Sequence, residues 1–257
     1  MIRKRLIPRI LVKEVNDSHV AVISKHFDSF NTVGDPVSQF GIMEANMADE
    51  ISIINVGNDQ SLSRRNFLDL LKMIVRASST PIVAGGGIKT FLDVDNFMKV
   101  GIEKVAIPLR IDLANVEIVN YAYKKFGKQS VQVCLDYKEL DEAYLMNKSE
   151  RRLELNDLLR ITSVYCTNGA GELVLTDMSR DGSKSGLNLN ILKPFIEVLS
   201  VPIIVSGGAH NQNNFAEAFL MGADGVISGT YFAKKDHSLI QLRSSIVGSG
   251  ISLRKLG

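Results

Sequence analysis

Short runs of β-branched and other apolar residues alternate along the chain with longer segments whose apolar residues recur at helical spacing. The segment 66–77 places Phe67 and Leu71 on one face of a helix, and 92–100 and 215–221 show the same pattern. The short runs predict eight strands, at 5–12, 50–55, 81–84, 104–107, 131–136, 172–176, 202–206 and 225–228. Strands that alternate with helices are typical of a parallel α/β fold.

The sequence also repeats itself at a fixed offset of 121 residues. PIVAGGG at 81–87 corresponds to PIIVSGG at 202–208, and the same offset carries Val105 onto Val226. A similarity that persists over several predicted strands indicates two equivalent structural halves. Eight strands in 257 residues therefore predict a single-domain (βα)₈ TIM barrel over residues 1–257, with an internal half-barrel repeat.

Composition narrows the classes of partner and compartment. Thirty Lys plus Arg against 28 Asp plus Glu give a net charge of +2, which predicts no nucleic-acid partner and no binding to a membrane surface. We expect a cytoplasmic protein, because the sequence shows neither a long apolar span nor the pattern of a signal peptide. Cys134 and Cys166 have no zinc-site spacing, so we expect reduced structural thiols, no metal and no cofactor.

Glycine-containing segments fall where a barrel would bind its ligand. In this fold the active site lies at the carboxyl ends of the strands, often with phosphate after the last two. Candidate phosphate-binding residues at these ends are Gly86, Gly87, Gly207, Gly208, Gly229 and Thr230. Glycines there either make tight turns or let backbone N–H groups approach phosphate oxygens. Their symmetric placement favours an elongated substrate with a phosphate at each end.

One acidic residue is placed for proton transfer. Asp136 ends the fifth predicted strand, so its carboxylate is expected in the barrel mouth as a general acid or base, or else serves as a turn residue. The half-barrel repeat places Leu11 where an opposing acid would stand. Asp181 and Gly182 lie in a polar loop and either bind substrate hydroxyls or are simply solvated.

Two further regions are candidates for function. The long segment 14–35, which contains Lys25, is a candidate lid over the active site. At the opposite end of the barrel, charged residues occupy the first positions of four predicted strands, at Arg5, Glu50, Lys104 and Glu172. On physical grounds alone, two cations and two anions at that face favour a stabilising ion-pair network.

Five ordered segments carry a resemblance to a known family. They are KRLIP at 4–8, GDP at 34–36, AGGGI at 84–88, SRDGSKSG at 179–186 and PIIVSGGA at 202–209. Over essentially the whole chain they resemble the cyclase subunit of imidazole glycerol phosphate synthase. The resemblance implies a (βα)₈ barrel that takes ammonia from a glutaminase subunit at its amino-terminal face and uses it on a phosphorylated substrate at its mouth.

The resemblance also implies roles for the candidate residues. The four charged residues match the family's ammonia gate, and Asp136 matches one catalytic aspartate. Asp181, Gly182 and the glycine segments match substrate or phosphate positions, and Lys25 lies near the position of a substrate-binding lysine.

The chain departs from the family pattern at several of these positions. The second catalytic aspartate falls at Leu11, the loop lysine at Ile23, a strand-two aspartate at Asn55, and a polar pair at Pro108 and Leu109. This pattern resembles divergent second copies linked to surface-polysaccharide sugars. It implies delivery of ammonia, with a third, amidotransferase protein, to convert an acetamido sugar or sugar nucleotide into an acetamidino sugar. Histidine-pathway ring closure and lyase chemistry by Asp136, or a non-catalytic scaffold for the two partners, are the alternatives.

Overall fold

Eight parallel strands close into a barrel, which confirms the predicted fold. The computed structural model describes residues 3–16, 18–57, 61–141, 143–146, 149–233 and 238–254, with the side chains of 61–64 left aside. The barrel strands follow one another in chain order, and the last pairs in parallel with the first. They are β1 (Arg5–Val15), β4 (Ile51–Asn55), β5 (Ile82–Gly85), β6 (Lys104–Pro108), β7 (Val131–Leu140), β9 (Glu172–Asp177), β10 (Ile203–Ser206) and β11 (Gly225–Ser228).

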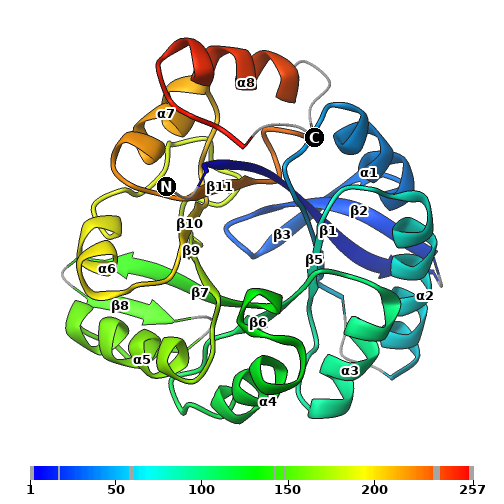
Figure 1. The fold of residues 1–257 in the computed structure, drawn as a ribbon, viewed down its shortest axis with the longest axis horizontal. Helices are drawn as coiled ribbons and strands as arrows, with labels where there is room; N and C mark the ends of the chain where they lie inside the picture. The colour runs from blue at the N-terminus through cyan, green and yellow to red at the C-terminus, as the bar shows by residue number, and fades with distance from the viewer. Residues whose placement is uncertain are drawn as a thin grey trace.

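In the described part of the chain, eight helices surround the barrel as an outer ring (Figure 1). They are α1 (Pro36–Ala45), α2 (Ser61–Ala77), α3 (Phe91–Val100), α4 (Val116–Phe126), α5 (Leu155–Thr167), α6 (Leu192–Val198), α7 (Gln212–Leu220) and α8 (Leu239–Gly248), and a short 3₁₀ turn, Lys128–Ser130, precedes β7. Side-chain caps define some of their starts: the Thr90 hydroxyl and Asp93 form a capping box on α3. No helix in the described ranges is long and apolar enough to cross a bilayer.

Side chains alternate between two cores because successive residues of a strand point to opposite faces. On β1, Leu6 and Ile10 belong to the large core between strands and helices. Ile7 instead packs inside the barrel, in a small cluster with Val174, Ile204 and Ile227. Odd-numbered residues of β1 and even-numbered residues of β7 therefore point into the barrel. Along each of these strands they form a row of side chains from the amino-terminal end of the barrel to its mouth.

Antiparallel strands that the sequence pattern did not predict extend two edges of the mouth. The candidate lid segment continues β1 and then forms a hairpin of β2 (Ser18–Lys25) and β3 (Ser29–Gly34). A shorter strand, β8 (Ala143–Met146), pairs with the extended end of β7. The hairpin carries Phe27 and Phe30 into the wall of the mouth, which places part of this segment over the barrel opening.

Candidate functional site

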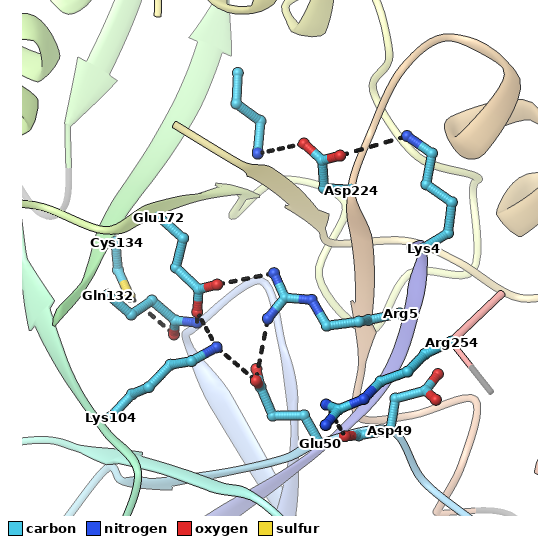
Figure 2. A network of polar contacts seen from close by, with 11 residues as sticks. Lys4, Arg5, Asp49, Glu50, Lys104, Gln132, Cys134, Glu172, Asp224 and Arg254 are labelled. Atoms are coloured by element: carbon cyan, nitrogen blue, oxygen red, sulfur yellow. Dashed lines mark hydrogen bonds and ion pairs between the residues drawn. The ribbon is translucent and has the colours of Figure 1, made fainter. Parts of the chain in front are cut away.

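The four charged strand-start residues form a closed ring at the amino-terminal end of the barrel (Figure 2). Arg5 places Nη1 at 3.1 Å from Glu50 Oε2 and Nη2 at 2.8 Å from Glu172 Oε2. Lys104 Nζ lies 2.6 Å from Glu50 Oε2 and 2.8 Å from Glu172 Oε1. Each cation therefore holds both acids, as the spacing of these residues at four strand starts predicts.

The two acids of the ring differ in how well they are bonded. Glu172 also accepts a hydrogen bond from Gln132 Nε2 at 2.7 Å, whereas Glu50 Oε1 is buried and has no partner among the described residues. Burial and the charge of Glu172 raise the pKa of Glu50. Burial alone would raise the pKa of Glu172 too, but the charges of Arg5 and Lys104 outweigh it and lower that pKa. Glu172 is thus the more firmly held anion of the ring.

A column of polar side chains on β7 leads from this ring to the mouth. Gln132, Cys134 and Asp136 lie at alternate positions of the strand and all line the same interior cavity. Gln132 contacts the ring at one end, and its Oε1 lies 4.0 Å from Cys134 Sγ. Burial raises the pKa of Cys134, so its side chain stays a protonated thiol. Gln132 was not singled out from the sequence, although its inward position beside Glu172 follows from the strand register.

The cavity at the mouth has a volume of about 350 Å³ and a largely apolar wall. Leu11 contributes to this wall and can neither give nor take a proton. Asp136 ends the polar column here, as predicted. Burial raises the pKa of Asp136, although the charge of Arg9 and a hydrogen bond with Thr176 oppose the shift. The mouth therefore holds one carboxyl group suited to act as a general acid.

Arg9 is a buried cation at the mouth that the sequence analysis missed. Its Nη2 lies 2.7 Å from Asp181 Oδ1, and about a tenth of each side chain is exposed. Its buried Nε has no hydrogen-bond partner in the described part of the chain. The alternation along β1 could have revealed Arg9, because Arg5, Ile7, Arg9 and Leu11 share the inward parity.

Asp181 also fastens the loop after β9 to the hairpin. Ser24 Oγ donates to Asp181 Oδ2, and the backbone N–H of His26 donates to the Asp181 carbonyl at 2.9 Å. Gly182 has φ +68°, and a Cβ there would lie 2.0 Å from the Ser24 carbonyl oxygen. Lys25, a predicted substrate ligand, is exposed and is not among the residues that line the described cavities.

The remaining predicted ligands divide between two places. A small pocket between β10 and β11 brings together Asp181, Gly182, Gly207, Gly208, Gly229 and Thr230. Arg9, Lys184 and Ser206 line it too. Gly86 lies apart from these residues, in the wall of the mouth cavity, and Gly87 lines none of the described cavities. The structure thus assembles one of the two predicted glycine sites into a polar pocket.

Comparison with known proteins identifies the family to which this barrel belongs. The family model described as "Histidine biosynthesis protein" matches residues 5–238. The chain is 30% identical to a Prochlorococcus marinus protein named as imidazole glycerol phosphate synthase subunit hisF2, over 99% of both chains. It is 30% and 32% identical to the imidazole glycerol phosphate synthase subunits HisF of Bacteroides thetaiotaomicron and Alkaliphilus metalliredigens, over 99% of this chain and 100% of theirs. The chain belongs to the histidine biosynthesis protein family, among its HisF-like imidazole glycerol phosphate synthase subunits.

Proposed function

We propose that this chain is the ammonia-using barrel subunit of a glutamine amidotransferase. A separate glutaminase docks at the amino-terminal face, and its ammonia enters through the ring of Arg5, Glu50, Lys104 and Glu172. The ammonia then passes along β7 to an acceptor beside Asp136. One observation carries this proposal: Gln132 both bonds the ring acid Glu172 and lines the mouth cavity, so polar groups connect the two ends of the barrel. The names of the HisF relatives support it.

The acid pair needed for ring closure is incomplete at this mouth. Asp136 can give a proton or take one, but an opposed base is absent where Leu11 stands. This favours an acceptor that needs a single acid. In the proposed reaction, a third protein polarises the carbonyl of a sugar acetamido group and ammonia adds to its carbon. Two hydrogens pass from the ammonia nitrogen to the carbonyl oxygen, which leaves as water and gives the acetamidino group. The mouth would deliver the ammonia, and Asp136 would protonate the leaving oxygen.

Histidine-pathway ring closure is the second candidate, because relatives that match over the whole chain are named as imidazole glycerol phosphate synthase subunits. The deciding assay follows ammonia-dependent consumption of the family's ribulosyl aminoimidazole carboxamide ribonucleotide by the purified chain and by Leu11→Asp. We expect turnover by the natural chain to be about 10²- to 10⁴-fold slower than by Leu11→Asp, since this is the usual rate cost of losing one acid of a pair. Efficient turnover by the natural chain would instead establish the histidine reaction.

The route for ammonia is tested separately, in the complex with the glutaminase. Arg5→Ala and Glu172→Ala should lose stimulation of glutamine hydrolysis by the barrel, because each opens the ring at a residue that holds two partners. A chain that only scaffolds its partners would keep normal coupling in both variants, and that result would refute the channel.

A further inference from the structure

The two halves of the barrel build their glycine turns in the same way. Gly86 after β5 and Gly207 after β10 have φ values of +100° and +99°. A Cβ on Gly86 would lie 2.2 Å from the Asn55 carbonyl oxygen, and one on Gly207 would lie 2.4 Å from that of Asp177. Both positions therefore need glycine for the same reason. The turns lie on opposite sides of the barrel (Figure 1), where the repeat predicts two equal phosphate sites.

The neighbouring strand ends differ, and this difference removes one of the two sites. The 121-residue offset aligns Pro108 with Gly229 and Leu109 with Thr230. Pro108 has no backbone N–H. The N–H of Leu109 is already bonded to the Cys134 carbonyl at 2.8 Å, and its side chain is fully buried. The β5–β6 side therefore offers no donor from this strand end to a phosphate.

The β10–β11 side keeps its donors available. The backbone N–H groups of Gly229 and Thr230 donate to no described residue, and Thr230 adds a hydroxyl at the pocket. Ser206 is buried in the same pocket, and its Oγ has no hydrogen-bond partner in the described ranges. A buried hydroxyl in this state is satisfied by a ligand or by water.

The charges around this pocket also favour an anion. Arg9 lines it, and the buried Nε of this guanidinium has no hydrogen-bond partner in the described ranges, so a charged donor remains beside the Arg9–Asp181 pair. Across the mouth, the cavity wall is uncharged where Leu11, Ile54 and Pro108 lie. A phosphate placed there would lose its hydration and gain no N–H donor from the end of β6, which is costly.

We infer that the mouth binds a ligand with a phosphate at one end only, anchored between β10 and β11, with its remainder against the uncharged wall on the β5–β6 side. This inference deepens the proposed function, because it names the class of acceptor: a phosphorylated molecule with one anchored phosphate rather than a bisphosphate with a phosphate at each end. The internal repeat, taken alone, predicts the bisphosphate.

Calorimetric titration of the isolated chain tests the inference with three probes: inorganic phosphate, fructose 6-phosphate and fructose 1,6-bisphosphate. We expect one phosphate per chain. The two sugar phosphates should bind with affinities within about threefold of each other, because the second phosphate meets an uncharged wall and finds no N–H donor at the end of β6. Thr230→Val should weaken phosphate binding about tenfold or more, since it removes a hydrogen bond to a charged group. Leu109→Val, which places the same residue at the aligned position, should leave the affinity unchanged.

Three results would overturn the inference. The first is a stoichiometry of two phosphates per chain, or an affinity for the bisphosphate about tenfold higher than for the monophosphate. The second is phosphate binding that neither Thr230→Val nor Ser206→Ala weakens. The third is no detectable binding at about 20 mM phosphate. Thermal unfolding of each variant separates lost binding from lost folding. Neither glutaminase nor ammonia is present in this titration, so its failure leaves the proposed ammonia route standing, and loss of that route would leave the phosphate result standing.

Discussion

At the scale of single residues, Asp136 is held in surroundings that suit chemistry better than stability. Its carboxyl is half-buried in an apolar-walled mouth, and only the charge of Arg9 and the hydrogen bond with Thr176 favour its ionised form. The effect of burial is larger than these two, so the pKa of Asp136 is raised. Active sites commonly contain such groups, whose surroundings lower the stability of the folded chain but favour the reaction.

Asp136→Asn should therefore stabilise the chain near neutral pH. Below the ordinary aspartate pKa of about 3.9 the carboxyl is protonated in both the folded and the unfolded state. As the pH rises above that value, the unfolded chain releases the proton more readily than the folded chain, so the natural protein loses stability that asparagine does not lose. Urea unfolding at about pH 7 and about pH 3.5 should show a gain for the variant that shrinks in acid. An equal gain at both values would show that ionisation is not its cause.

Arg9 and Asp181 form a pair in which each residue depends on the other. Arg9→Met should lower the free energy of unfolding by about 3 kcal/mol, because it leaves Asp181 as a buried charge without its cation. Adding Asp181→Asn should recover most of that loss, and urea unfolding of the two single variants and the double variant measures the coupling. A double variant no more stable than Arg9→Met would show that the two side chains act independently.

At the scale of elements, the loop after β9 and the β2–β3 hairpin behave as one unit. The hairpin residues Ser24 and His26 both donate to Asp181, and Gly182 packs against the Ser24 carbonyl. A hairpin fastened in this way closes one side of the mouth. Release of this contact would be the simplest way to open it.

Gly182→Ala should release the hairpin, and Gly186→Ala in the same loop is its matched control. Both glycines have positive φ, so each alanine costs about 1–2 kcal/mol in backbone strain. The added Cβ of Gly182→Ala also meets the Ser24 carbonyl, whereas at Gly186 the nearest atom, Asn214 Nδ2, is 3.5 Å away. Hydrogen exchange should accelerate over 18–34 in Gly182→Ala and not in the control. Equal protection of the hairpin in both variants would refute the contact.

At the scale of the whole molecule, most of the barrel could be predicted from the sequence, because its strands are buried on both faces and read as short apolar runs. The hairpin was missed, since exposed residues such as Asn31 and Thr32 dilute its pattern. The four ring residues could be found from their strand positions. The alternation along β1 already places Arg9 inward, whereas the contact of Gln132 with Glu172 depends on the register of β7 against β9. The loss of the second glycine site depends on the bond between the Leu109 N–H and the Cys134 carbonyl.

The ring also joins the two half-barrels, since Arg5, Glu50 and Lys104 come from the first repeat and Glu172 from the second. Glu172→Gln should cost about 3–5 kcal/mol near neutral pH, because it removes one of the two anions that hold both cations and leaves Arg5 and Lys104 to share Glu50. The pKa of Glu172 is lowered by folding, so its contribution is present above the unfolded value of about 4.3 and is lost as the pH falls through the folded value. The deficit of the variant should therefore shrink in acid.

Asp224→Asn is the matched control for this variant. Asp224 pairs with Lys4 at 3.5 Å at the same end of the barrel but outside the ring, and about a fifth of each side chain is exposed. The control should cost less than about 1 kcal/mol. Urea unfolding across this pH range compares the two variants. If they lost the same stability, or if the deficit of Glu172→Gln did not depend on pH, the ring would not hold the two halves together through charge. The closure of the ring would then have to come from packing.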